Sequence, residues 1–247
     1  MNGRVPAPRR PEAEITGVLA VVAHPDDESF ALGAVLDRLG GLGARTAVLC
    51  FTAGEASTLH AVPGRLPAIR ERELRDAATV LGLDRVELLH YPDGGLSEVP
   101  LDELAGHVRR LVVAQRPSHL LVFDTGGVTG HPDHDRATAA ALAAARTTGL
   151  SVLAWTLPEH VAKTLNSELG SAFVGRPDHE IDLTWTVSRE RQRQAIDRHR
   201  SQSTDNPVLW RRLRLLGEVE HLRLLYQPDP LTRPTPTDEE AARCRTP

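Results

Sequence analysis

The sequence lacks the features that mark several common classes of protein. It has only two cysteines, Cys50 in an apolar, strand-like segment and Cys244 in a polar tail, so no disulfide framework is expected. The longest apolar run near the start, residues 18–23, is too short for a signal-peptide core or a membrane span. We therefore expect an unprocessed, soluble protein in the cytoplasm.

A strongly basic surface is also missing. The chain has 29 Lys and Arg residues against 33 Asp and Glu residues, and its net charge is −4. Electrostatic binding to nucleic acid needs clustered positive charge, which these counts and the scattered arginines do not provide. We expect neither a nucleic acid nor a membrane as a partner, and the sequence leaves the oligomeric state open.

A glycine-rich phosphate loop is absent from the junction where the first strand should pass into the first helix. The apolar residues 18–22 are followed there by "AHPDDES" at 23–29, where a dinucleotide-binding protein carries G-x-G-x-x-G. Acidic side chains at this place would repel a phosphate group. A non-catalytic, Rossmann-like nucleotide-binding module is therefore only a remote alternative.

What the sequence does contain is a regular alternation of short Val/Leu-rich runs and longer helical patterns. This alternation is typical of βαβ units and predicts an α/β protein: one Rossmann-like, three-layer domain with a mostly parallel sheet, over residues 15–226. The polar, Pro-rich segments 1–14 and 227–247 are expected to be tails, the first of them disordered. The expected strands are 17–23, 46–51, 86–90, 119–124, 152–156 and 179–185; the expected helices are 27–39, 67–81, 101–115, 135–146, 188–200 and 209–226.

Two His-Pro-Asp units each follow a predicted strand. One is "HPDDE" at 24–28 after the first strand, and the other is "HPDH" at 131–134 after the fourth. Acidic residues at a helix start can simply cap it, but capping does not require three histidines. In a doubly wound sheet the fourth strand lies beside the first, and ligands bind where their loops diverge. We therefore expect both units to meet in one crevice.

Ligands of the His and carboxylate type are typical of a catalytic zinc site, which keeps one position open for water. Neighbouring side chains point in different directions, so one of Asp26 and Asp27 can bind the metal while the other acts as a base. The same division can hold for His131 and His134. Mixed nitrogen and oxygen ligands suit Zn²⁺ and also Fe²⁺.

The pairing of "AHPDDE" with "HPDH" resembles the LmbE/PIG-L family of zinc-dependent N-acetylglucosaminyl deacetylases. This family includes enzymes of mycothiol, bacillithiol and glycosylphosphatidylinositol biosynthesis. The resemblance covers most of the chain. Weaker similarities are "TAGEAS" at 52–57, the spacing of Arg70 and Glu73 before "LGL" at 81–83, "YPDGGL" at 91–96 and "HRSQ" at 199–202.

The resemblance implies that His24, Asp27 and His134 hold the zinc ion. It implies that Asp26 is the general base that takes a proton from the zinc-bound water as this water attacks the amide carbonyl. These roles suit the chemistry, because zinc lowers the pKa of its water and polarises a carbonyl group.

Four further residues receive roles from the same resemblance. His131 would stabilise the oxyanion or protonate the departing amine, with Asp133 orienting its ring. Arg70 and Asp93 would contact the sugar. For these two, a helix-surface charge and a Pro-Asp-Gly turn are the competing interpretations.

Glu28 is expected to be an acid of the first helical turn or a support for the metal ligands. No role is derived for His199, Ser201 or Gln202.

The predicted function is removal of an N-acyl group, most often acetyl, from an amino sugar or from a glycoside that contains N-acetylglucosamine. Alternatives within the same family are an amidase acting on a thiol–sugar conjugate and a deacetylase of antibiotic tailoring. The expected partner is a small molecule.

Overall fold

The computed structural model describes residues 14–59 and 65–229. The expected tails therefore lie almost entirely outside the described residues, as does Cys244. Cys50 is a buried free thiol in the second strand. Within the described residues, no helix combines the length and the apolar character that crossing a bilayer would require.

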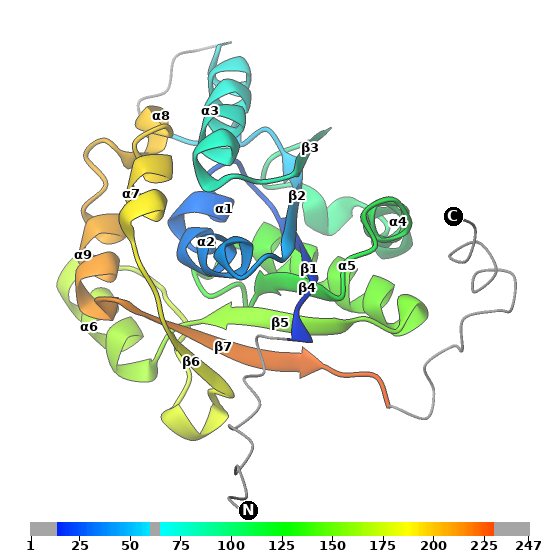
Figure 1. Cartoon of the computed structure of the whole chain (residues 1–247). Coiled ribbons are helices and arrows are strands. Elements are labelled where there is room, and N and C mark those ends of the chain that lie inside the picture. Colours follow the sequence, from blue (N-terminus) through cyan, green and yellow to red (C-terminus); the bar gives the residue numbers. More distant parts are fainter. Residues whose placement is uncertain (1–13, 60–64, 230–247) are drawn as a thin grey trace, which may run out of the picture.

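One seven-stranded sheet forms the centre of the protein, with the strand order β3-β2-β1-β4-β5-β7-β6 (Figure 1). Its first five strands are parallel, whereas β7 pairs antiparallel with both β5 and β6. The mostly parallel sheet and the place of β4 beside β1 confirm the prediction. The strands are β1 (Gly17–Val22), β2 (Arg45–Thr52), β3 (Arg85–Tyr91), β4 (His119–Phe123), β5 (Ser151–Thr156), β6 (Leu183–Thr186) and β7 (Val219–Tyr226).

Helices cover both faces of the sheet, which gives the predicted three layers. The side chains of β1 alternate between two cores: Val18 and Ala20 belong to one, Leu19 and Val21 to the other. Helices α4 and α5 pack on the second core, and α2, α3 and α6 contribute to the first (Figure 1). The helices are α1 (Asp27–Phe30), α2 (Gly33–Gly41), α3 (Leu66–Leu81), α4 (Leu101–Gln115), α5 (Pro132–Thr148), α6 (Glu159–Leu169), α7 (Glu190–Ile196), α8 (Arg200–Ser203) and α9 (Pro207–Leu216).

The predicted helix at 27–39 is in fact two helices, α1 and α2. Gln192 of α7 donates hydrogen bonds to the carbonyls of Ser29 (3.0 Å) and Phe30 (3.2 Å), which would otherwise serve a continuous helix. Gly33 begins the second helix, and a Cβ atom there would lie 3.0 Å from Gln192 Cγ. A tertiary contact therefore divides a segment whose local pattern favours one helix.

The predicted helix at 209–226 is wrong in its second half. Helix α9 ends before Gly217, which has φ 56° and ψ −133°, and the chain then returns as strand β7. Within this strand Glu220 and Leu222 are buried while His221 between them is partly exposed, which is the period of two that a strand requires. The helix predicted at 188–200 is likewise divided into α7 and α8. The strand predicted at 179–185 is β6, which is shorter and begins later. Helix α6 is not among the expected helices.

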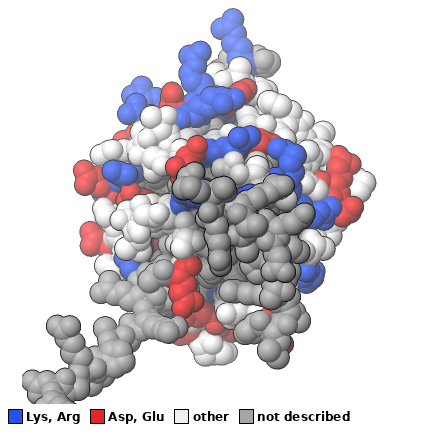
Figure 2. Space-filling model, turned by 45° about the vertical axis from the view of Figure 1, so that its right-hand side comes forward, with Lys and Arg blue, Asp and Glu red and all other residues white. Residues whose placement is uncertain are grey.

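Basic and acidic side chains are interspersed over the face of the protein that Figure 2 displays. Basic side chains gather toward the upper edge of this view and acidic ones form a group at its right edge, with both signs present between them.

A buried ion pair joins the antiparallel edge of the sheet to α7. Arg189 and Glu220 are 5% and 1% exposed, and Arg189 Nη1 lies 2.5 Å from Glu220 Oε1. The other carboxylate oxygen accepts a hydrogen bond from Trp155 Nε1 in β5 (2.7 Å). Removing one member of such a pair leaves the other charge buried without compensation.

We therefore expect Arg189→Met to lower the free energy of unfolding by about 3–5 kcal/mol, measured by urea denaturation. The matched control is Arg211→Met, which removes an arginine from an exposed pair with Glu168 and should have little effect. Equal stability of the two variants would contradict a structural role for the buried pair.

Candidate active site

The loop after β1 contains an aspartate with an unusual backbone conformation. Asp26 precedes α1 and has φ 111° and ψ −26°, in the left-handed region that residues other than glycine rarely occupy. Such a conformation persists only where its surroundings enforce it. Arg70 of α3 donates hydrogen bonds to the carbonyls of Pro25 (2.5 Å) and Gly54 (2.6 Å). It also donates to Asp26 Oδ2 at 2.9 Å, so one guanidinium group fixes the loop and the carboxylate together.

Three potential metal ligands meet at the carboxyl ends of β1 and β4. His24 Nδ1 lies 3.1 Å from His134 Nε2, which in turn lies 3.2 Å from Asp27 Oδ1. The distance from His24 Nδ1 to the other oxygen of Asp27 is 3.8 Å. In a tetrahedral zinc site, bond lengths of about 2.0–2.1 Å separate the ligand atoms by about 3.4 Å. The donor set and its spacing therefore fit one shared ion.

Hydrogen-bond partners indicate which ring nitrogens face this point with a lone pair. His134 Nδ1 lies 2.9 Å from Thr129 Oγ1 and 3.2 Å from the Gly127 carbonyl, so its N–H donates away from the group. His24 Nε2 lies 2.9 Å from Asp93 Oδ1, an ion-pair contact without hydrogen-bond geometry, and the charge of this carboxylate favours keeping the proton on that nitrogen. The lone pairs of His24 Nδ1 and His134 Nε2 are then directed toward each other and toward a carboxylate. Such an arrangement is unfavourable unless a cation lies among them.

The electrostatics of the group also favour a cation. Burial lowers the pKa of His24, but Asp133, Asp93 and Asp27 outweigh this effect and raise it to about 10. Burial raises the pKa of Asp27, yet His134 and His24 hold it well below its usual range. The same excess of carboxylates that keeps a proton on the cluster would attract a divalent ion.

The loop before α5 needs glycine to reach the metal-binding position. Gly127 has φ 72°, and a Cβ atom there would lie 2.8 Å from the His131 carbonyl and 3.2 Å from His134 Cβ. The helix itself begins at Pro132, three residues earlier than predicted, with His131 as its N-cap. This earlier start puts His134 in the first helical turn, with its ring buried at the end of β4.

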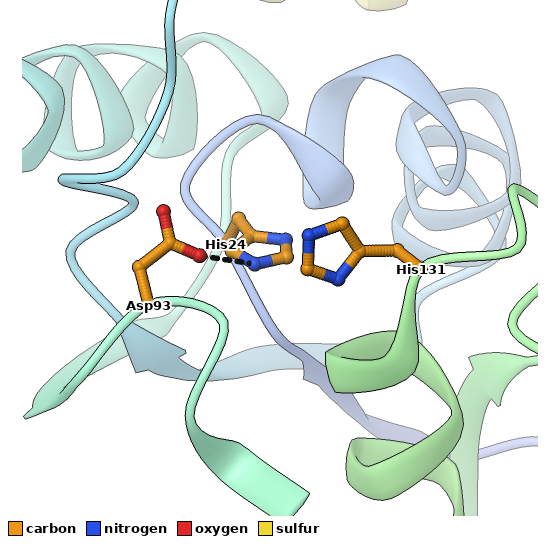
Figure 3. A group of neighbouring side chains, drawn as sticks. All are labelled: His24, Asp93 and His131. Atoms are coloured by element: carbon orange, nitrogen blue, oxygen red, sulfur yellow. Dashed lines mark ion pairs between the residues drawn. The ribbon is translucent and has the colours of Figure 1, made fainter.

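A second group of possible ligands lies on the other side of the His24 ring. Figure 3 shows the His24 ring between Asp93 and His131, which come from the loops after β3 and β4. The rings of His24 and His131 are 4.6 Å apart at 77°. As whole residues Asp93 and His131 are only partly buried, whereas Asp27 and His134 are buried, although the Asp93 side chain itself is 6% exposed. The ring nitrogen Nδ1 of His131 already accepts a hydrogen bond from Asp133 N. The group of His24, Asp27 and His134 is therefore the better candidate for a buried metal centre.

Two predicted catalytic residues lie beside the candidate ligands. Burial raises the pKa of Asp26 to about 6, although Arg70 opposes this effect. The carboxylate is thus ionised at neutral pH and has a basicity suited to proton transfer. His131 Nδ1 accepts a hydrogen bond from the Asp133 backbone N–H (3.2 Å). Because burial lowers the pKa of His131, its ring is neutral near pH 7 and carries its proton on Nε2.

The side chain of Asp133 does not bind the ring of His131 as expected. It is fully buried, and its oxygens accept hydrogen bonds from Gly94 N (2.8 Å) and Leu96 N (3.1 Å) in the loop after β3. One of these oxygens also lies 3.5 Å from His24 Nε2. The orientation of His131 thus comes from the backbone of Asp133, and the carboxylate holds a neighbouring loop instead.

The two predicted sugar-binding residues line the pocket but have few free polar atoms. Arg70 is 3% exposed and is engaged by two carbonyls and Asp26. The Asp93 side chain is 6% exposed and is shared between Ala56 N and His24. By these contacts Arg70 holds the loop that carries Asp26, and Asp93 holds His24 and the loop after β2. The contact with a sugar stays a prediction for both residues.

The structure places two residues whose site contacts the sequence does not specify: Glu28, expected as a first-turn acid or a support for the metal ligands, and His199, for which no role is derived. Glu28 and His199 are both fully buried, and His199 Nε2 lies 2.7 Å from Glu28 Oε1. Glu28 Oε2 accepts a hydrogen bond from the backbone N–H of Asp26 at 2.9 Å. In addition, Ser201 donates through its N–H and its hydroxyl to Glu73 of α3. The weak "HRSQ" similarity was the available signal, but its partners lie more than 100 residues away in the chain.

A pocket of about 620 Å³ opens over this site. Seven of the eight predicted site residues line this pocket: His24, Asp26, Asp27, Arg70, Asp93, His131 and His134. Asp133 is buried behind the lining. The two distant His-Pro-Asp units therefore meet at one pocket.

Comparison with known proteins finds relatives that are named as deacetylases. The family model described as "PIG-L: GlcNAc-PI de-N-acetylase" matches residues 19–145, which include both His-Pro-Asp units. A 1D-myo-inositol 2-acetamido-2-deoxy-alpha-D-glucopyranoside deacetylase from Catenulispora acidiphila is 34% identical over 187 residues, or 65% of this chain and 56% of that protein. The chain spans about half the length of the first relatives that it matches.

Solved structures share the fold at low sequence identity. An N,N'-diacetylchitobiose deacetylase from Pyrococcus horikoshii has a TM-score of 0.64 at 20% identity, with 90% of each chain covered. A 4-carboxy-2-hydroxymuconate hydratase from Pseudomonas putida has a TM-score of 0.63 at 17% identity, covering 87% of this chain and 98% of that one. The fold alone thus serves more than one reaction, whereas the family match includes the site itself. By this match, the chain belongs to the PIG-L family.

Proposed function

We propose that the protein is a metal-dependent hydrolase that removes an N-acyl group, such as acetyl, from an amino sugar or from a glycoside that contains an amino sugar. The observation that carries this proposal is the convergence of His24, Asp27 and His134 on one buried point beside Asp26. The family membership and the deacetylase names of the relatives support it. A cytoplasmic location remains the prediction made from the sequence.

His24, Asp27 and His134 would hold the metal ion. When bound, Zn²⁺ or Fe²⁺ would supply a Lewis acid that polarises the amide carbonyl and lowers the pKa of water. The ligand types suit either ion.

Asp26 would accept the proton of the attacking water. Its carboxylate faces the pocket, and Arg70 keeps it in place. The proton that Asp26 accepts is then available for the amine nitrogen when the C–N bond breaks. His131 would donate its Nε2–H to the carbonyl oxygen as negative charge develops there, which is the usual role of a fixed donor in acyl transfer.

Glu28 and His199 would act through Asp26. Glu28 binds the backbone N–H of a residue whose conformation is strained, and His199 holds Glu28 from behind. The pair thereby supports the left-handed backbone that directs the Asp26 carboxylate into the pocket. Their role is to position the base rather than to contact the substrate.

An amidase for a thiol–sugar conjugate and an antibiotic-tailoring deacetylase would use the same chemistry. They differ in the group attached to the sugar, so an assay of amine release should include N-acetylglucosamine, a thiol conjugate and a glycosylated aglycone. The three substrates are distinguished by kcat/KM.

Removal of the metal should abolish amine release, and added Zn²⁺ or Fe²⁺ should restore it. We expect His134→Ala to reduce both the metal content per chain and the activity, because a three-ligand site loses one of its ligands. His160→Ala is the matched control, since His160 is an exposed histidine of α6. Full activity of chelator-treated protein without bound metal would refute the metal-dependent reaction.

Asp26→Asn should retain the metal and lose about 10²–10⁴-fold in kcat, because the amide cannot accept the proton. The measurement is kcat of the metal-loaded variant together with metal content per chain. Asp102→Asn, at an exposed position of α4, is the control. Near-normal kcat in metal-loaded Asp26→Asn would show that another group is the base.

Glu28→Ala should lower kcat by about 10–100-fold, as expected for a residue that orients a reacting group. KM and metal content should remain near those of the parent protein, because neither the pocket lining nor a metal ligand is removed. Glu28→Gln should recover most of the activity, since its amide oxygen can still accept the Asp26 N–H. Loss of metal in Glu28→Ala, or a rise in KM alone, would contradict a role through Asp26.

A further inference from the structure

The pocket has two chemically different sides. On one side, the loops after β2 and β3 contribute mostly polar groups. Ser57 and Thr58 come from the first loop, and Asp93 and Gly94 from the second. The amide side chain of Gln202 closes the same side and accepts a hydrogen bond from Ser57 Oγ at 2.7 Å. This polar side suits the hydroxyl groups of a sugar.

The opposite side of the pocket is mostly apolar. It is built by α1, the end of β4, the segment after α6 and the first turn of α9. We name it the apolar side after its apolar residues, which are Phe30, Ala31, Phe123, Phe173, Val208 and Leu209. Three polar residues from neighbouring segments, Thr129, Ser171 and Asn206, also line the pocket. Ala31, Phe123 and Leu209 are at most 2% exposed, so the wall is anchored in the core.

The apolar side begins directly at the candidate metal centre. The ring of Phe123 stacks on the ring of His134 with a centroid distance of 4.5 Å. Phe30 lies one helical turn after Asp27 and packs against Leu209 and its neighbours in α9. The apolar surface is therefore within reach of a group attached to the carbonyl carbon that reacts there.

The direction of the amide bond determines what this surface meets. In an N-acyl amino sugar, the sugar and the acyl chain are attached to opposite ends of the amide. With the carbonyl carbon between Asp26 and the metal ligands and the sugar on the polar side, the acyl chain extends along the apolar side. An acetyl group would present a single methyl group to six apolar side chains.

Arg212 of α9 is a charged residue that lines the pocket next to the apolar side. It is 5% exposed, donates a hydrogen bond to the Phe30 carbonyl (2.7 Å) and lies over the Trp155 ring at 5.1 Å. Its Nε has no hydrogen-bond partner among the described residues. An acyl chain that ends in a carboxylate is therefore the rival that the experiment has to exclude.

We propose that the acyl group of the natural substrate is an uncharged, apolar chain longer than acetyl, and that it binds on the apolar side. This inference rests on the proposed hydrolysis. In that reaction water adds across the C–N bond, the acyl chain leaves as a carboxylate and the sugar keeps the free amine.

The test is a series of glucosamine amides that differ only in the acyl group: acetyl, butanoyl, hexanoyl and glutaryl. Amine release by the metal-loaded protein gives kcat/KM for each. Burial of each additional methylene should raise kcat/KM by about four-fold, so hexanoyl should exceed acetyl by more than about 100-fold if all four methylenes are buried. Acetylglucosamine with an apolar group at the anomeric carbon is measured beside them.

A variant of the apolar side tests whether the acyl chain binds there. Val208→Asp puts a carboxylate into the apolar side at the first turn of α9, where an acidic residue favours the helix. It should lower the ratio of hexanoyl to acetyl turnover by at least about 10-fold relative to the parent protein. The control is Val113→Asp, the same change at a 75% exposed position of α4, which should leave the ratio unchanged.

Each outcome supports or overturns the inference. A preference that rises with chain length and falls in Val208→Asp supports it. Equal or better turnover of acetyl, a preference for glutaryl, or a gain that follows only the apolar anomeric group overturns it while leaving the deacylase reaction intact. Failure of the metal-loaded protein to release amine from any of these amides overturns the proposed function and this inference with it.

Discussion

The site depends on one electrostatic constraint: electron pairs of two imidazoles and a carboxylate converge within about van der Waals contact in a buried space. His24, Asp27 and His134 are each less than 8% exposed, so water cannot relieve their repulsion as it would at a surface. The chain retains this arrangement because hydrogen bonds on the far side of each group hold it there. The neighbouring features of the site follow from the need to support that convergence.

Support for the site comes from segments that are distant in the sequence. Arg70 reaches from α3 to the loop after β1, and Asp133 reaches from α5 to the loop after β3. His199, from the segment between α7 and α8, reaches Glu28. Each of these side chains is buried and binds at least one partner across the sheet edge or the neighbouring loop. The parallel strands provide the common edge, and these long-range contacts set the finer geometry.

The sequence predicts the part of this design that has a local signature. The alternation of strands and helices gives the mostly parallel sheet, and the two His-Pro-Asp units at the ends of β1 and β4 indicate where the pocket lies. The division of α1 from α2 could not be predicted, because it depends on Gln192 from a distant helix. The sequence predicts a helix where strand β7 lies, because the apolar residues there fit either period and only pairing with β5 and β6 decides between them. The carboxylate of Asp133 binds a loop rather than His131, and no spacing in the sequence specifies that choice.

The left-handed backbone at Asp26 sets stability against reactivity. Glycine is the residue that would occupy this conformation with least strain, yet glycine has no group that could accept a proton. In the proposed role of Asp26, stability and catalysis therefore favour different residues at the same position. Under the proposed function, the strained backbone at this position is retained because the carboxylate of Asp26 is needed to accept a proton, so the loop gives up stability for reactivity.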